Sequence, residues 1–339
     1  MDNITHTMTG VILSRVGLHR IAPHATMTLV LAANAPDVDV ITWAWGQLAY
    51  LRYHRGLTHS LIGIPVLAAL VVLVVRLAAR RGGKEFRWGR NYMVALIGVA
   101  SHPVMDLANT YGIRPWLPFS GQWYSWDISF LVDLWVWILL FIALGVPAVG
   151  RLISSEIGDR AGSGRGPAVF VLLCLVGWWT ARGVIHWRAV AMLDAHVYGF
   201  NPAAASDTDG SARSPKGVPP LRVAAFPTPA NPLVWHGFVE TENFYQLVDV
   251  DVRRPLDPTT GRIVYKPEAS PVLEAALRTD TAAQFSRFAR YRYAQVDRRE
   301  DGYRVTLSDF RFQAERRNAF VCTIDLDRDL RVSGESFSF

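Results

Sequence analysis

Four apolar runs within the first 185 residues constrain the fold of this chain more than any other feature. They cover residues 61–79, 92–108, 128–150 and 167–185. Each is close to the roughly 20 residues with which an α-helix crosses the hydrocarbon core of a bilayer. We therefore predict about four membrane-spanning helices. Two shorter apolar stretches, 8–18 and 25–35, cannot span and are expected to form partial or re-entrant helices packed against the others.

The composition divides the chain into a membrane part and a water-soluble part. Of the 339 residues, 50% are hydrophobic and 19% are charged, which is apolar for a soluble domain and polar for a pure membrane bundle. Acidic and basic side chains balance after residue 199, so the net charge of +6 belongs to the first part. Its basic excess lies in loops between apolar runs, and nucleic-acid binding is therefore not expected.

The residue composition and the hydrophobic pattern predict three regions along the chain. Residues 1–199 are expected to form a helical polytopic membrane domain, and residues 200–220, rich in Ala, Ser, Gly and Pro, a linker. Residues 221–339 alternate in the manner of half-buried strands, with one helical segment at 270–291. They predict a small α+β domain outside the membrane. Its expected strands cover residues 238–252, 261–265, 303–312 and 320–326.

Loop charges predict how the membrane domain is oriented. Basic side chains gather in the loops after the first and third apolar runs, and the positive-inside rule makes both loops cytoplasmic. These residues are Arg76, Arg80, Arg81, Lys84, Arg87, Arg90, Arg151, Arg160 and Arg165. The opposite face then receives the histidines and carboxylates at the ends of the apolar runs, together with the C-terminal domain. The positions of these histidines and carboxylates were not used to derive the orientation, so their gathering on one face supports a common site.

The motif SHPVMD, residues 101–106, carries the strongest metal-binding signal. His102 and Asp106 lie four residues apart, so on a helix they project from one face and can bind the same cation. Pro103 complicates this interpretation, because it favours a kink or the start of a new helix. Charged groups inside an apolar segment also need partners, since an unpaired charge there costs roughly 2.5 to 3.5 kcal/mol or more.

Two further motifs, HRGLTHS at 54–60 and NAPDVD at 34–39, supply more possible ligands. His54 and His59 are five residues apart around Gly56, which favours a turn whose Thr58 or Ser60 caps the next helix. Asp37 and Asp39 could bridge two metals, supply one ligand and one acceptor that orients a ligand, or only shape a turn.

His6 and Asp127 complete the inventory. Three or more imidazoles with bridging carboxylates are typical of hydrolytic sites that activate water with divalent ions. Taken singly, an interfacial histidine is more often hydrogen-bonded than a ligand, and Asp127 could simply cap a helix. Arg55 and Arg114 lie near the possible ligands and could bind a substrate phosphate or only lipid headgroups.

The order of these motifs carries a resemblance to a known family. NAPDVD, HRGLTHS and SHPVMDLANTYGIRPWLPF, followed by a Trp and Asp127, resemble the bacterial inner-membrane metal-dependent hydrolases of the YdjM and YbcI type. The match covers about residues 1–150, and FPTPANPLVWHGF at 226–238 more loosely resembles the extension of longer members. That family is in turn similar to zinc-dependent phospholipase C. The resemblance implies ligands in the order His102 and Asp106, then His59, Asp39 and His6, and then His54, Asp37 and Asp127.

We therefore expect a multi-pass hydrolase of the bacterial inner membrane with one to three zinc-like divalent ions. Its site would face the non-cytoplasmic side, and a spare carboxylate, Asp37, would handle the proton. Membrane lipids are the expected partners, because a site at bilayer level suits a lipid phosphodiester or another amphipathic ester. Two alternatives stay open: a metal-stabilised scaffold or transport component without hydrolytic activity, and a membrane anchor for a working soluble domain.

Overall fold

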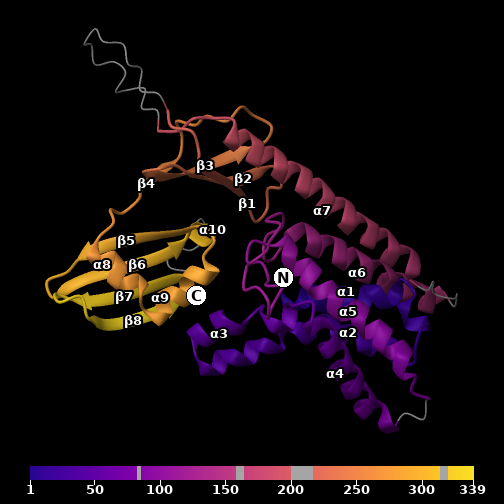
Figure 1. Cartoon of the computed structure of the whole chain (residues 1–339). Coiled ribbons are helices and arrows are strands. Elements are labelled where there is room, and N and C mark those ends of the chain that lie inside the picture. The colour runs from indigo at the N-terminus through magenta and orange to yellow at the C-terminus, as the bar shows by residue number, and fades with distance from the viewer. Residues whose placement is uncertain (82–84, 158–163, 200–216, 314–319) are drawn as a thin grey trace. The chain divides into compact units, whose positions relative to one another are not determined.

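A computed structural model describes residues 1–81, 85–157, 164–199, 217–313 and 320–339 (Figure 1). The chain divides into two compact units, Met1–Ala181 and Arg182–Phe339. The division falls inside a long helix, α7 (Arg165–Asp194), whose last turns pack with strands of the second unit. Most of the expected linker at 200–220 lies outside the described residues.

The first unit is helical, as the sequence predicts. Its α-helices are α1 (Asn3–Arg15), α2 (Ala25–Asn34), α3 (Gln47–Tyr53), α4 (Gly63–Ala78), α5 (Trp88–Ala108), α6 (Leu134–Ile157) and the first part of α7. Short 3₁₀ helices connect them: η1 (Leu18–Arg20), η2 (Ala35–Trp45), η3 (Leu57–His59) and η4 (Ala79–Arg81). Helix α2 packs against both α1 and α5, and α4 packs against α5. The two short apolar stretches of the sequence thus become α1 and α2.

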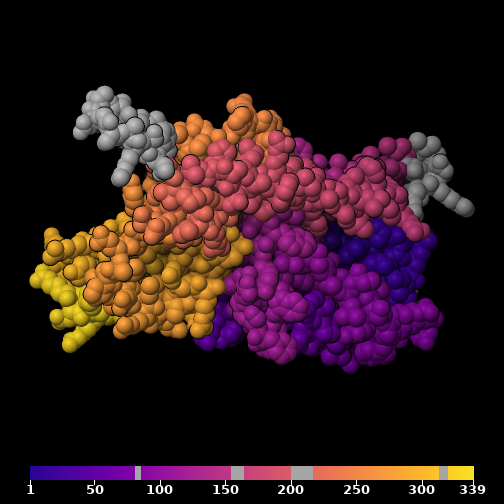
Figure 2. All heavy atoms as spheres, turned by 45° about the horizontal axis from the view of Figure 1, so that its top comes forward, coloured from indigo at the N-terminus to yellow at the C-terminus, as the bar shows by residue number. Residues whose placement is uncertain are grey.

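Among the described residues, two helices are long and apolar enough to cross a membrane, Leu134–Ile153 of α6 and Arg165–Asp194. A third span results if Gln47–His59 and Gly63–Ala78, bent by 84°, are counted as one broken span or re-entrant loop. The predicted count of four is therefore not confirmed, and α5, the least apolar of the predicted runs, is absent from this set. Helix α7 forms a continuous pink band in Figure 2, with apolar side chains such as Phe170 and Leu173 exposed along it.

Side-chain caps determine where several helices begin, and one helix continues through a proline. Asp2 accepts the backbone N–H of Thr5 at 3.0 Å and begins α1, and Asp133 accepts the N–H of Val136 at 3.2 Å at the start of α6. Ser60, one of the two expected caps, accepts the N–H of Gly63 at 3.0 Å before α4. Pro103 does not begin a new helix, because α5 continues through it from Trp88 to Ala108.

The second unit contains two four-stranded antiparallel sheets (Figure 1). The first consists of β1 (Arg222–Pro227), β2 (Val234–Glu240), β3 (Phe244–Asp251) and β4 (Arg262–Tyr265), in that order. The second consists of β5 (Arg292–Arg298), β6 (Gly302–Asp309), β7 (Val321–Asp327) and β8 (Val332–Ser338), with α8 (Pro271–Leu277), α9 (Asp280–Phe288) and the short α10 (Phe310–Gln313). The predicted α+β class is confirmed. The strand expected at 238–252 is instead the β2–β3 hairpin, and the helix expected at 270–291 is α8 and α9.

The core of the second unit begins on α7. Ala189 and Leu193 of this helix pack with Trp235, Val239 and Val248 of the first sheet. A second cluster, which includes Phe238 and Phe310, joins the two sheets. Because α7 supplies one side of the first core, the second unit starts at Arg182 rather than after residue 199.

Candidate metal centre

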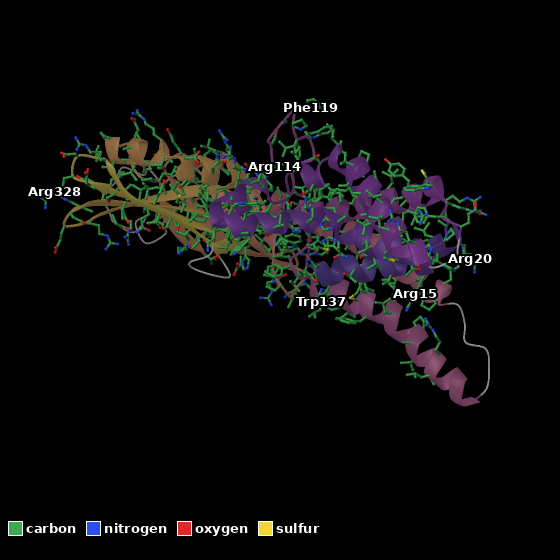
Figure 3. All side chains as sticks on the ribbon, turned by 90° about the horizontal axis from the view of Figure 1, so that it is seen from below. Arg15, Arg20, Arg114, Phe119, Trp137 and Arg328 are labelled. Atoms are coloured by element: carbon green, nitrogen blue, oxygen red, sulfur yellow. The ribbon has the colours of Figure 1, made fainter. Side chains whose placement is uncertain are left out.

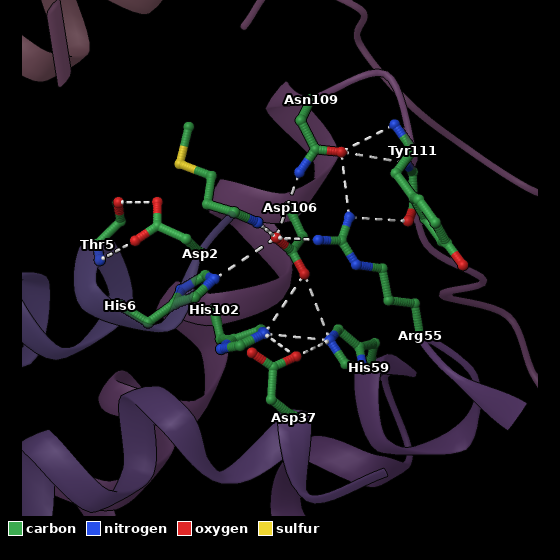
Figure 4. Close-up of polar contacts among 12 residues, drawn as sticks. Asp2, Thr5, His6, Asp37, Arg55, His59, His102, Asp106, Asn109 and Tyr111 are labelled. Carbon is green, nitrogen blue, oxygen red and sulfur yellow. Dashed lines mark hydrogen bonds and ion pairs between the residues drawn. The ribbon is translucent and has the colours of Figure 1, made fainter. Parts of the chain in front are cut away.

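Three segments of the first unit bring six of the predicted site residues together. Helix η2 carries Asp37 and Asp39, the α3–η3 turn carries His54 and His59, and α5 carries His102 and Asp106. All six are buried. Figure 4 shows Asp37, His59, His102 and Asp106 pointing toward one another from these separate segments.

Four donor atoms converge at the centre of this cluster. The Nε2 atoms of His59 and His102 are 3.1 Å apart. Asp37 Oδ1 lies 3.5 Å from the first nitrogen and 3.3 Å from the second. Asp106 Oδ2 lies 3.4 Å from each of them. These four residues form one group able to hold a metal ion, and Asp37, Asp39 and His54 form an overlapping second group.

Hydrogen bonds at the far side of each ring indicate which nitrogen carries its proton. His102 Nδ1 lies 2.7 Å from the carbonyl oxygen of Ala33 and must donate to it. His59 Nδ1 lies 3.0 Å from the hydroxyl of Thr58, which already donates to Asp39 Oδ2 at 2.6 Å and so accepts from the ring. Both Nε2 atoms therefore present lone pairs to the centre of the cluster. A cation is the group that such converging acceptors require.

Asp39 orients the histidines around the cluster. Its Oδ1 lies 2.7 Å from His54 Nδ1, and its Oδ2 accepts the backbone N–H of Arg55 at 3.0 Å as well as the Thr58 hydroxyl. Burial raises the pKa of the Asp39 carboxyl, but hydrogen bonds with His54 and His59 outweigh burial and lower it below its ordinary value. Asp39 is thus an ionised acceptor at neutral pH.

The Oδ1 atom of Asp106 faces the guanidinium of Arg55 and the amine of Met1. It lies 3.1 Å from Arg55 Nη2 and contacts the Met1 amine. Asn109 holds the same guanidinium, because its Oδ1 accepts from Arg55 Nη1 at 3.1 Å. The other oxygen of Asp106, Oδ2, has no hydrogen-bond partner among the described residues. The carboxylate therefore has one oxygen fixed by the protein and one left for the cluster.

The turn that carries Arg55 is shaped by its backbone. Arg55 has φ of 54°, in the left-handed region that few non-glycine residues adopt. At the next position, a Cβ on Gly56 would lie 2.7 Å from the carbonyl oxygen of Tyr53 and 2.9 Å from Arg114 Nη2. The glycine of HRGLTHS is thus required for this close approach, which brings His54 and His59 to one site.

His6 lies beside the four converging donors rather than among them. Its ring stacks on His102, with ring centroids 3.6 Å apart, and its Nε2 lies 3.5 Å from Asp106 Oδ1. Neither ring nitrogen has a hydrogen-bond partner among the described residues. Burial, helped by the neighbouring His102, lowers the pKa of His6 well below its ordinary value. The ring is therefore neutral at pH 7 and available as a ligand.

The other sequence-predicted residues lie further from the centre. Neither group of possible ligands among the described residues includes Asp127, whose Oδ1 accepts from Ser125 at 2.7 Å. The Arg55 guanidinium is committed to Asp106 and Asn109. Arg114 Nη2 donates to the carbonyl oxygen of Arg52 at 2.7 Å, and its guanidinium lies over the ring of Trp123. Both arginines thus hold the protein's own loops in place.

Two residues of the site were not singled out as site residues in the sequence. Asn109 follows Asp106 by three positions, and its Oδ1 also accepts the backbone N–H of Tyr111 at 2.9 Å. Its place one turn after the candidate ligand Asp106 was the available signal. Thr58 was expected only as a helix cap, and its role depends on Asp39, which lies 19 residues earlier in the chain.

Comparisons with known proteins agree with this two-part architecture. A family model described as YdjM inner membrane protein matches residues 1–189, and one described as YfhP C-terminal alpha/beta plait domain matches residues 271–339. The uncharacterized protein YfhP of Bacillus subtilis (strain 168) is 24% identical over 343 aligned residues, which cover 98% of this chain and 93% of that protein. No solved structure matches. The first model covers more than half of the chain and confirms the YdjM part of the resemblance expected from the motifs. The chain thus belongs to the YdjM inner membrane protein family.

Proposed function

We propose that this protein is a membrane-bound, metal-dependent hydrolase that cleaves a phosphodiester or ester of a lipid or another amphipathic substrate. The observation that carries the proposal is the convergence of four buried donor atoms, two of them imidazole nitrogens that each lie 3.1 to 3.5 Å from the other three donors. The likeness to zinc-dependent phospholipase C and the identity of the ion as zinc are parts of the same proposal.

The donor set fits a zinc-like ion. Four ligands at about 2.0 to 2.1 Å from a tetrahedral zinc ion lie about 3.3 Å from one another. The five separations that involve His59 Nε2 or His102 Nε2, including those to Asp37 and Asp106, bracket this value, from 3.1 to 3.5 Å. Imidazole nitrogens and carboxylate oxygens are also ligands that zinc accepts. The orphaned Oδ2 of Asp106 would gain the partner that it lacks.

Charge balance supports the same assignment. Three buried carboxylates, Asp37, Asp39 and Asp106, lie among the histidines, together with one buried guanidinium, Arg55, and the amine of Met1, whose pKa burial lowers well below its ordinary value. Burying like charges together is costly unless cations compensate them. A divalent ion at the point of convergence would offset the remaining negative charge.

Each residue of the cluster then has a distinct role. A bound divalent ion lowers the pKa of a coordinated water and polarises a phosphoryl or acyl oxygen. His59 and His102 would hold the ion, oriented through their Nδ1 protons by Thr58 and by Ala33, as outer partners of metal ligands commonly do. Asp37 belongs to both ligand groups, so we assign it as a ligand rather than the proton acceptor expected from the sequence. Asp39 fixes His54 through Nδ1, which leaves His54 Nε2 as the group that takes up a proton.

The topology of the proposal follows the loop charges. Arg76 lies near the end of α4, and Arg87 and Arg90 lie at the start of α5. His59 instead precedes α4, and His102 and Asp106 lie near the end of α5. The positive-inside rule therefore favours a cluster on the non-cytoplasmic side. The second unit would lie on that side too, and the protein would cross the membrane several times. Membrane lipids are then the proposed partners of the cluster.

A second candidate function is a metal-stabilised scaffold or transport component without hydrolytic activity. One observation favours it: four protein donors can complete the coordination of a tetrahedral ion, as in structural zinc sites, and leave no open position for water. The ion would then hold η2, η3 and α5 together.

Metal analysis combined with substrate assays tests both functions. Detergent-purified wild-type protein, His102→Ala and Asp106→Ala would be measured for bound metal and for hydrolysis of phospholipid vesicles and of a soluble aryl phosphodiester. His19→Ala is the control, because His19 is an exposed histidine of the same unit. We expect both cluster variants to lose metal and activity together while the control keeps both. Metal loss without activity in any protein would favour the scaffold, and unchanged metal in both variants would refute the ligand assignment.

A further inference from the structure

Exposed apolar side chains lie directly beside the buried acids of the cluster. In η2, Asp37 and Asp39 are 9% and 6% exposed, whereas Val38 and Val40, which alternate with them, are 56% and 53% exposed. Ile41, the next residue, is also exposed. The segment therefore turns its carboxylates inward and its aliphatic side chains outward. The exposed face of η2 beside Asp37 and Asp39 is therefore apolar.

Exposed aromatic residues extend this apolar face. Helix η2 exposes Trp43 and Trp45, and the loop between α5 and α6 exposes Trp116, Phe119 and Trp126. We call these five residues the aromatic rim. Phe119 is 84% exposed, and Figure 3 shows it at the tip of its loop, directed away from the helices, whereas Arg20 lies toward the other end of the unit. Aromatic side chains of this kind gather where a bilayer meets water.

The geometry of α3 and α4 fits a position at the membrane surface. The segment Gln47–His59 is bent by 84° from Gly63–Ala78. Helix α4 exposes aliphatic side chains such as Val66, Leu70 and Leu73 along its length, as a helix that contacts lipid does. If α4 follows the membrane normal, α3 lies nearly in the plane of the membrane.

Aromatic rings in contact with one another connect the rim to the cluster. Trp43 contacts Tyr50 at a centroid distance of 5.1 Å, and Tyr50 stacks on His54 at 4.3 Å. Tyr111 contacts His54 from the other side at 5.7 Å and Trp123 at 5.7 Å. His54 thus lies between two aromatic walls, one of which reaches the exposed surface at Trp43.

We propose that the aromatic rim inserts into the boundary of headgroups and acyl chains, and that the metal cluster is entered from this lipid side. The molecule that enters is a membrane amphiphile, whose polar headgroup reaches Asp37 and His54 while its acyl chains stay among Val38, Val40 and the rim. The insertion of the rim stands independently of any catalysis. The identity of the entering molecule as a substrate rests on the proposed function.

Depth measurements on the full chain in lipid nanodiscs test the insertion. Nitroxide labels would be placed with Val40→Cys and Phe119→Cys, in a Cys174→Ser background in which Cys322 is buried. Val332→Cys is the matched control, because Val332 is a valine of β8 that is 51% exposed in the second unit. We expect the two rim labels to collide with oxygen more than with an aqueous nickel complex, and the control label to show the reverse. Rim labels as accessible to nickel as the control would overturn the proposal.

Hydrolysis of two substrates tests the entrance. Trp45→Ser and Phe119→Ser change exposed side chains, so metal content should be unchanged. We expect both variants to lose about tenfold or more of phospholipid hydrolysis in vesicles, and distinctly less hydrolysis of a soluble phosphodiester, because the rim contacts only the lipid. Equal losses for the two substrates would refute the lipid-side entrance. If wild-type protein hydrolyses neither substrate, the proposed function fails, and the label depths alone decide whether the rim inserts.

Discussion

The Nε2 atoms of His59 and His102 lie 3.1 Å apart where both side chains are fully buried. Each ring places its proton on Nδ1, so two lone pairs face each other with the carboxylates of Asp37 and Asp106 close by. Acceptors at this separation repel unless a positive charge lies between them. If the cluster holds the proposed ion, the stability of the fold depends on it. Stability is then a readout of metal binding that does not require a known substrate.

Removal of the divalent ion should destabilise the folded protein. An ion that binds only the folded state stabilises it by about 2.7 kcal/mol when its free concentration is 100 times its Kd. We expect the melting temperature of detergent-solubilised protein to fall with EDTA and to recover with excess zinc. His102→Ala lacks one donor and should melt at the same temperature with and without zinc. A wild-type melting temperature that is indifferent to EDTA and zinc would contradict metal binding in the cluster.

Asp37 and Asp39 should differ in their effect on metal affinity although they are two residues apart. Asp39→Asn removes the anionic acceptor of His54 and should weaken binding by roughly 10- to 100-fold, as loss of an outer partner does. Asp37→Asn removes a donor from both ligand groups and should weaken binding more. Competition with a chelator measures both affinities. Asp249→Asn is the control, since Asp249 forms a 2.8 Å pair with His236 in the second unit.

The order of those two affinities decides between the ligand role and the orienting role. If Asp39→Asn weakens binding more than Asp37→Asn, Asp39 is the ligand, as the family resemblance implied. If Asp249→Asn also weakens binding, the measurement reports general destabilisation of the protein.

The pairing of His102 with Asp106 could be predicted from the sequence because helical periodicity alone puts them on one face of α5. Loop charges likewise predicted that separate motifs would meet. The division of roles between Asp37 and Asp39 could not be predicted. It depends on the 3₁₀ conformation of η2 and on two donors from another segment, the Arg55 backbone and the Thr58 hydroxyl.

Inside the second unit, the boundaries of a strand and of a helix were misplaced for a similar reason. The β2–β3 turn contains neither Gly nor Pro, and Thr241 shapes it by accepting the backbone N–H of Phe244 at 3.2 Å. Thr279 ends the expected long helix by capping α9, where its hydroxyl accepts the N–H of Ala282 at 3.2 Å. A threonine in the sequence does not by itself indicate a turn or a helix cap, because threonine is also common inside strands.

Acid should destabilise the metal-free protein. Burial lowers the pKa of His6, so below about pH 6.5 the unfolded chain binds a proton that the folded protein does not. Stability must then fall as the pH drops below that value. The lowered pKa of Asp39 extends the loss in the same direction, below about pH 3.9, where the unfolded carboxyl becomes protonated.

Thermal melts between pH 8 and pH 5, with a chelator present throughout, measure this slope. His6→Asn should make the slope shallower, and His236→Asn, which changes a histidine of the second unit, should leave it unchanged. Stability that rises on acidification, or a wild-type slope in His6→Asn, would be inconsistent with a neutral buried His6.

Close packing of α5 against α2 should be needed for the metal cluster. A Cβ on Gly98 would lie 2.6 Å from the Cβ of Ala32 and 3.3 Å from the carbonyl oxygen of Leu29, so Gly98→Ala must push the helices apart. That movement displaces Ala33, whose carbonyl orients His102. We expect a loss of about 1 to 3 kcal/mol in stability, as for other overpacked sites, together with weaker zinc binding. Gly145→Ala in α6 meets no atom within 4 Å and should be neutral or stabilising, because alanine is the better helix former. Melting temperature and zinc affinity of the two variants provide the comparison, and equal values for both would show that this contact does not support the cluster.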